Sequence, residues 1–252
     1  MPLALELAVQ DLAGVRVARE IRARRVELTQ GLALGGLTPS PATLELAVEA
    51  AASAHGAGPD VEVHVLVRPR AGGFHYDADE IATAVRDVRW MLAHGATGVV
   101  IGAQNADGAL DADALARLRD AARDVRADAE VTLHRVIDVT PDPLAGLRTA
   151  VSLGLTRVLT SGGASAARDG RDMLRALVAA AEGRIQVMAG SGVTAENAAE
   201  IAATGVDALH FSAKRTVAAS GSVRMGSAAD DGGGHEVTER AEAQAVRTAL
   251  GL

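Results

Sequence analysis

Short aliphatic runs alternate with longer helical stretches along the whole chain. Eight runs rich in Val, Leu and Ile predict strands at 3–9, 26–29, 61–67, 98–102, 130–134, 156–160, 185–190 and 206–212. The stretches between them predict helices, for example at 77–94, 111–126, 141–153 and 194–204, and several begin with Asp, Thr or Pro. Strict alternation favours a parallel sheet, and eight strands close into a barrel. We therefore expect one (β/α)₈ TIM barrel of the α/β class over residues 1–252, with an open doubly wound sheet as the alternative.

One stretch departs from this rhythm. Residues 220–234 are rich in Gly, Ser and Asp and show no hydrophobic periodicity. They are expected to form a loop between the eighth strand and a last helix at 236–250. Because such a loop would lie on the mouth side of the barrel, two interpretations stay open: a surface loop without a role, or a flap that covers a ligand.

Polar residues alternate with aliphatic ones inside the predicted strands. Successive strand residues face opposite sides, so the valines at 61, 63, 65 and 67 should pack against helices while Glu62, His64, Leu66 and Arg68 point into the barrel. The same alternation on the other strands turns several more polar side chains inward. The candidate catalytic residues obtained in this way are Glu6, Glu27, His64, Arg68, His134 and His210.

So many ionisable side chains on one axis would be costly in a packed core, because an unpaired buried charge loses its hydration. Most of them lie near the carboxyl ends of their strands, where barrels of this kind place their active sites. A ligand site in the barrel mouth is therefore the favoured interpretation, although each residue alone could simply be a hydrogen-bonded interior group.

Glycine-rich turns follow the sixth and seventh strands. Backbone N–H groups in such turns bind anions well, and barrels often place a phosphate after strands seven and eight. A small anionic ligand could be held there, with Lys214 or Arg68 adding positive charge. The candidate ligand-binding residues are Ser161, Gly162, Gly163, Gly190, Ser191, Gly192 and Ser212.

Composition excludes several classes of function. The formal net charge is −7 and the chain has no basic stripe interleaved with aromatic residues, so a nucleic-acid partner is not expected. The sequence contains no cysteine, which excludes disulfides and thiolate metal sites. It contains neither a signal-peptide pattern nor an apolar run of the ~20 residues that span a bilayer. We expect a cytoplasmic protein without a membrane partner.

Several motifs together resemble the copper homeostasis protein CutC family. They run in the same order from residue 3 to about residue 225 and comprise Gly35-Gly36-Leu37-Thr38-Pro39-Ser40, Val63-His64-Val65, Val67-Arg68-Pro69-Arg70, Gly72-Gly73-Phe74, Leu133-His134-Arg135 with Asp138, Leu159-Thr160-Ser161-Gly162-Gly163, Val187-Met188-Ala189-Gly190-Ser191-Gly192-Val193 and His210-Phe211-Ser212. The resemblance implies a barrel, a cytoplasmic homo-oligomer and a role in copper handling.

The implied copper chemistry departs from the family pattern in one respect. Similar proteins often carry cysteine at the ends of the first two strands, where this chain has Ala8 and Thr29. Cu(I) prefers soft sulfur ligands, and Met188 is the one plausible inward sulfur. Candidate ligands for a divalent ion such as Cu(II) or Zn(II) are His64, His134 and His210, with Glu6 or Glu27.

Two functional hypotheses remain at this point. The first is a metal-binding protein of copper homeostasis, with the ion in the barrel mouth. The second is an isomerase, lyase or hydrolase that acts on a small phosphorylated or otherwise anionic metabolite. In that case Glu6, Glu27 or His134 would act as general acid or base, because an interior setting can move their pKa values toward neutrality.

Overall fold

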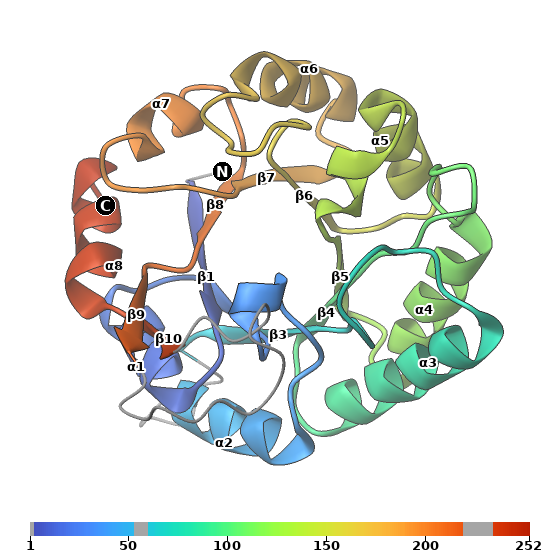
Figure 1. Ribbon diagram of the computed structural model, residues 1–252, viewed down its shortest axis with the longest axis horizontal. Helices are drawn as coiled ribbons and strands as arrows, with labels where there is room; N and C mark the ends of the chain where they lie inside the picture. Colours follow the sequence, from blue (N-terminus) through green and yellow to red (C-terminus); the bar gives the residue numbers. More distant parts are fainter. Residues whose placement is uncertain (1–2, 53–59, 219–233) are drawn as a thin grey trace.

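The computed structural model describes residues 3–52, 60–218 and 234–252. Eight parallel strands form a closed barrel in chain order, β1-β2-β3-β4-β5-β6-β7-β8, and β8 pairs with β1 to close it (Figure 1). The predicted TIM barrel is confirmed and the open sheet is excluded. The strands are β1 Ala4–Val9, β2 Arg25–Leu28, β3 Glu62–Leu66, β4 Gly98–Ile101, β5 Glu130–Leu133, β6 Arg157–Thr160, β7 Gln186–Gly190 and β8 Ala208–Phe211.

Helices form an outer ring around these strands (Figure 1). Aspartate, serine and proline begin several of them: Asp77, for example, accepts from the backbone N–H of Glu80, whose side chain accepts in turn from the N–H of Asp77. The helices are α1 Leu12–Glu20, α2 Pro41–Ala51, α3 Ala78–Ala93, α4 Ala112–Val125, α5 Pro143–Ser152, α6 Arg171–Ala181, α7 Ala198–Ala202 and α8 Arg240–Ala249, with short 3₁₀ turns η1 Leu32–Leu34 and η2 Arg135–Val139.

The main hydrophobic core lies between the barrel and the helices. Aliphatic residues of one strand parity fill it, among them Leu7, Val26, Val65 and Ile101. Burial of these side chains, worth roughly 1.5–3 kcal/mol each, fixes which parity faces outward and therefore which side chains line the barrel axis. None of the described helices combines the length and hydropathy that a membrane crossing requires.

The segment after β8 differs from the sequence prediction. Residues 236–238, expected to begin the last helix, instead belong to the strand β10 Gly234–Thr238, which pairs antiparallel with β9 Lys214–Ala218. Helix α8 therefore begins at Arg240. The predicted loop 220–234 lies outside the described residues, apart from Gly234 in β10. Helix α7 is also shorter than the predicted 194–204, because Asn197 accepts from the N–H of Thr194 and closes a turn before the helix.

Candidate functional site

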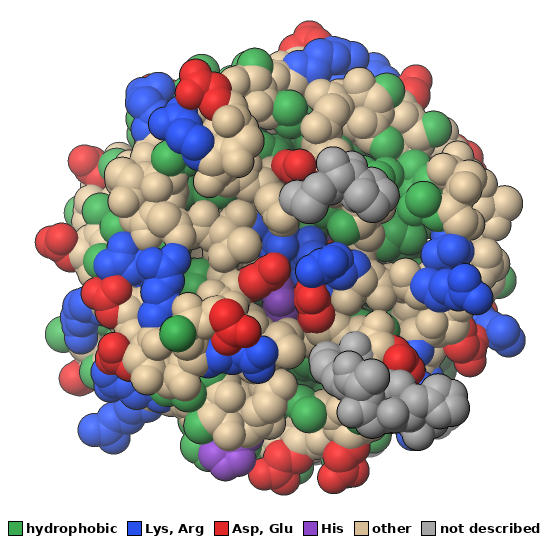
Figure 2. Space-filling model, turned by 180° about the vertical axis from the view of Figure 1, so that it is seen from behind, with side chains coloured by type: hydrophobic (Ala, Val, Ile, Leu, Met, Phe, Trp, Pro, Cys, Tyr) green, Lys and Arg blue, Asp and Glu red, His purple; other side chains and the backbone are tan. Residues whose placement is uncertain are grey.

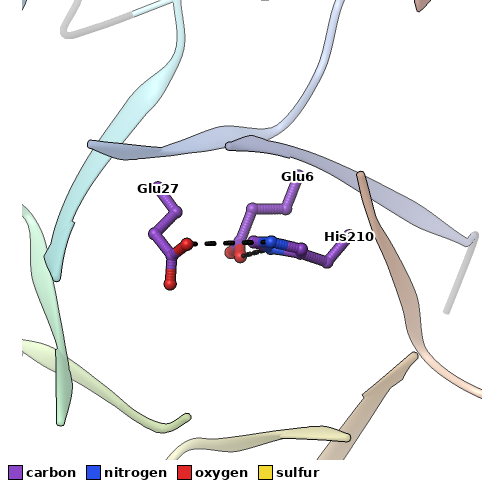
Figure 3. Close-up of side chains that lie close together, drawn as sticks. All are labelled: Glu6, Glu27 and His210. Carbon is purple, nitrogen blue, oxygen red and sulfur yellow. Dashed lines mark hydrogen bonds and ion pairs between the residues drawn. The ribbon is translucent and has the colours of Figure 1, made fainter. Parts of the chain in front are cut away.

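Three of the predicted inward residues meet just below the mouth of the barrel. Glu6 on β1 lies opposite His210 on β8 in the strand register, and Glu27 on β2 lies two residues nearer the mouth, opposite Ala8 (Figure 3). Nδ1 of His210 is 2.7 Å from Oε1 of Glu6, and Nε2 of His210 is 3.7 Å from Oε2 of Glu27. Because a carboxylate only accepts, the Nδ1 atom carries a proton, and Nε2 faces Glu27.

A buried arginine holds the second oxygen of Glu6. Nε of Arg25, on β2, donates to Oε2 of Glu6 over 2.5 Å, and the side chains are 1% and 0% exposed. Burial opposes ionisation of Glu6, but the hydrogen bond from His210 and the charge of Arg25 outweigh it and hold the pKa of Glu6 well below its usual range. Glu6 is therefore a fixed negative charge that orients His210.

Glu27 and His210 are both positioned to exchange a proton near neutral pH. Burial raises the pKa of Glu27 to about 7, and the negative charge of Glu6 acts in the same direction against the opposing effect of His210. Burial alone would lower the pKa of His210, but the carboxylates of Glu27 and Glu6 raise it above its ordinary value. The pair can serve as acid and base, or as two ligands of an ion.

A cavity of about 720 Å³ opens at the carboxyl ends of the strands. It lies over the pair Glu27 and His210, in the position where the strand pattern predicted a ligand site. Its wall includes Leu66, Arg68, Phe74, His134, Arg135, Leu159, Ser191, Gly192, Thr194, Ser212, Lys214, Arg215 and Glu239. The volume is that of a typical small-molecule pocket, for which ~300–1,000 Å³ is usual.

His134 lines this cavity as a neutral ring. Its Nδ1 accepts from the backbone N–H of Val136, so Nε2 carries the proton in the neutral form, and Nε2 has no partner among the described residues. Burial, helped by the charge of Arg68, lowers the pKa of His134 to about 3. The ring lies over Gly102, the residue directly after β4, where an added Cβ would be only 2.1 Å from Cε1. His134 can therefore donate one hydrogen bond but not act as a strong base.

The two cations proposed to help bind an anion are engaged elsewhere. Arg68 donates to the backbone oxygens of Leu34, Gly36 and Gly72 and lies 5.3 Å from the ring centroid of Phe74. Lys214 is ion-paired with Glu236 across the β9–β10 hairpin. Arg68 thus connects the loops at the mouth, and Glu236 neutralises part of the charge of Lys214.

The two glycine-rich turns differ in what they hold. After β6, the carboxylate of Asp138 accepts from the backbone N–H groups of Ser161 and Gly163 and from two hydroxyls, so the protein supplies its own anion there. Ser161, Gly162 and Gly163 are not part of the cavity wall. After β7, by contrast, Ser191 and Gly192 line the cavity, and Ser191 has a positive φ of 85°. Gly190 ends β7 directly beneath them, beside His210.

His64 lies deeper in the barrel than the mouth. It is not part of the cavity wall, and its Nε2 is 3.7 Å from Oε2 of Glu130, the first residue of β5. Burial lowers the pKa of His64 to about 3, so the ring is neutral. The three histidines singled out as metal ligands are therefore not brought together: His210 pairs with Glu27, His134 lines the cavity wall, and His64 faces the other end of the barrel.

Sequence reasoning missed three interior residues: Arg25, Arg157 and Glu130. Arg157, 1% exposed, donates to Glu130 over 2.6 Å and to the side chains of Thr132 and Gln186. The strand alternation could have identified two of them as inward-facing. Arg25 lies two residues before Glu27, and Glu130 lies two residues before Thr132. Glu6 and Glu130 are thus not isolated acids inside the barrel, because each is paired with a buried arginine.

Comparisons with known proteins agree with the fold. A solved structure of a CutC from Streptococcus agalactiae, described as a candidate copper homeostasis protein, matches with a TM-score of 0.75 and 29% identity over 83% of this chain and 98% of that one. A thiamine phosphate pyrophosphorylase from Pyrococcus furiosus, at 16% identity and a TM-score of 0.58, shares the fold alone, over 99% of this chain and 96% of that one.

Sequence relatives assign the family. A family protein CutC from Sinorhizobium medicae is 45% identical over 77% of this chain and 74% of its own length, and one from Xanthomonas campestris is 38% identical over 97% of each. The model of the CutC family matches residues 3–215, which include β1 to β8 and the residues Glu6, Glu27 and His210. The chain belongs to the CutC family.

Proposed function

We propose that this chain binds a divalent copper ion in the barrel mouth, through Nε2 of His210 and the carboxylate of Glu27, as part of copper homeostasis. One observation supports this most: Glu6 accepts from Nδ1 of His210 and so directs Nε2 toward Glu27. A carboxylate that fixes the far nitrogen of a histidine is the usual outer support of a metal-binding imidazole. Two ligand atoms 3.7 Å apart can both be ~2 Å from one ion.

The donor set decides which oxidation state of copper fits. The chain has no cysteine. Met188 lies beneath the mouth, fully buried, with its sulfur 4.0 Å from a guanidinium nitrogen of Arg25. The described residues of the mouth therefore offer nitrogen and oxygen, which suit Cu(II), and no soft sulfur for Cu(I).

Titration of the full chain with Cu(II) and a weak competing chelator tests the proposal. We expect one mouth site in the wild type, weakened at least tenfold in both His210→Gln and Glu27→Gln. The matched controls are His75→Gln and Glu45→Gln, which change exposed residues outside the cavity and should leave the affinity unaltered. If His210→Gln and Glu27→Gln both bind Cu(II) like the wild type, the proposed site is wrong.

The size of the cavity favours a second candidate function. A volume of about 720 Å³ far exceeds what a coordinated ion needs and suits a small anionic metabolite over the acid–base pair Glu27 and His210. The backbone around Ser191, Gly192 and Ser212 would bind the anion, and the reaction would be an isomerisation, cleavage or hydrolysis. Inorganic phosphate and oxalate should then raise the melting temperature by mass action, relative to sodium chloride of equal ionic strength. No rise with either probe would count against this candidate.

A further inference from the structure

A second cluster of ligand-type side chains lies at the amino-terminal end of the barrel. Glu62 and Glu130 are the first residues of β3 and β5, and His64 follows Glu62 on the same inward face. One ligand atom from each lies within 4.8 Å of the other two. We call Glu62, His64 and Glu130 the lower cluster. It is separate from Glu6, Glu27 and His210, which form the other such group among the described residues.

A glycine on the intervening strand makes this approach possible. β4 lies between β3 and β5, and its first residue, Gly98, leaves open the space that the ring of His64 occupies. A Cβ at Gly98 would be 2.8 Å from both Cε1 and Nε2 of His64. The ring thus extends across β4 toward Glu130, with Nε2 of His64 3.7 Å from Oε2 of Glu130.

Three buried polar atoms of the lower cluster have no hydrogen-bond partner among the described residues. The side chain of His64 is 0% exposed, and neither of its ring nitrogens has a hydrogen-bond partner among the described residues. Oε2 of Glu62 is buried and unpartnered in the same part of the structure. Buried polar groups are nearly always satisfied, and one left without a partner is destabilising. One ring nitrogen of the neutral His64 and Oε2 of Glu62 therefore each keep a lone pair for a ligand that accepts electron pairs.

We propose that the lower cluster binds a divalent transition-metal ion of the Zn(II) type, independently of the mouth. One imidazole nitrogen and two carboxylates form a nitrogen–oxygen donor set that suits such an ion. Arginines bound to the carboxylates supply the outer support: Arg24 donates to Oε1 of Glu62 over 3.0 Å, and Arg157 to Oε2 of Glu130 over 2.6 Å. Each carboxylate keeps further lone pairs that can coordinate the ion. The negative charges of the two carboxylates offset part of the positive charge of the ion.

The cluster has an entry path from solvent. The side chains of Glu62 and Glu130 are 28% and 27% exposed, whereas His64 is enclosed, so the two carboxylates form the rim and the imidazole the base of the site. Figure 2, which views the molecule from the side opposite to Figure 1, shows acidic, basic and histidine side chains gathered at the centre of that face. An ion could reach the lower cluster without passing through the mouth.

Zn(II) titration of the full chain in the His210→Gln background, where the mouth lacks its imidazole, tests the inference. We expect one remaining Zn(II) site and a Zn(II)-dependent rise in melting temperature. Both should be lost, or the affinity weakened at least tenfold, when His64→Gln or Glu62→Gln is added. Glu62 lies at the rim, so Glu62→Gln decides the question even if His64→Gln does not fold.

Two results would overturn the inference: no Zn(II) site in the His210→Gln background, or one that the added Glu62→Gln leaves unchanged. This outcome is independent of the copper proposal, which is tested separately by Cu(II) binding to His210→Gln and Glu27→Gln, each made as a single substitution in the wild type. Glu45→Gln, added to His210→Gln, is the control for the loss of one carboxylate and should not alter Zn(II) binding.

Discussion

Replacing Glu6 with glutamine should destabilise the barrel strongly. The side chain stays nearly isosteric, but its charge is removed while Arg25, 1% exposed, keeps its own, since a guanidinium does not deprotonate in proteins. Removing one member of a buried ion pair costs about 3–5 kcal/mol, because the remaining charge is neither hydrated nor paired. For a chain of this length that corresponds to a melting temperature lowered by about 6–20 °C.

Chemical denaturation and thermal melting of Glu6→Gln measure this cost. Glu200→Gln is the matched control, because Glu200 is half-exposed in its ion pair with Arg171 and such pairs contribute less than about 1 kcal/mol. Adding Arg25→Met to Glu6→Gln removes the uncompensated charge and should recover part of the lost stability. If Glu6→Gln lowered the free energy of unfolding by less than about 1 kcal/mol, the ion pair of Glu6 and Arg25 would not be the buried, stabilising interaction described above.

Three further predictions concern the interior and the turn after β6. Gly102→Ala places a Cβ 2.1 Å from the ring of His134 and should lower the free energy of unfolding by about 1–3 kcal/mol, whereas Gly73→Ala, with open space around it, should change it by less than about 0.5 kcal/mol. The pKa of about 3 for both His64 and His134 lies below the unfolded value of 6.5, so the stability that these two rings contribute should be full above pH 6.5 and be lost as the pH drops toward 3. Denaturation midpoints measured between pH 7 and 4 should show that His134→Gln loses less stability over this range than the wild type does. Asp138→Asn removes the anion that the turn after β6 surrounds and should cost about 1–3 kcal/mol in urea denaturation.

The strand alternation predicted the barrel and the inward face of Glu6, Glu27 and His210, because burial of aliphatic residues against helices leaves little choice of parity. It did not predict Arg25, whose strand was expected to begin at Val26. Arg25 is tolerated inside only because Glu6 comes from a neighbouring strand, and this pairing depends on register.

Non-local partners explain the other differences. Residues 236–238 carry a pattern that continues into a helix, yet they pair with residues of β9 that lie 20–24 positions earlier. The role of Asp138 depends on the turn after β6 lying beside η2. Similarly, His64 shows the same alternation in its strand as the mouth residues do. Which end of the barrel a side chain faces depends on how the strands are staggered, and the alternation does not give that.

The most direct test of the interior arrangement is a nitrogen-15 NMR titration of the histidine side chains, assigned with His64→Gln, His134→Gln and His210→Gln. We predict that His210 is protonated at Nδ1 and titrates above its ordinary pKa of 6.5, while His64 and His134 stay neutral down to about pH 4. If His210 titrated below 6.5, or if His64 and His134 titrated near that value as in exposed histidines, the interior arrangement described above would be contradicted.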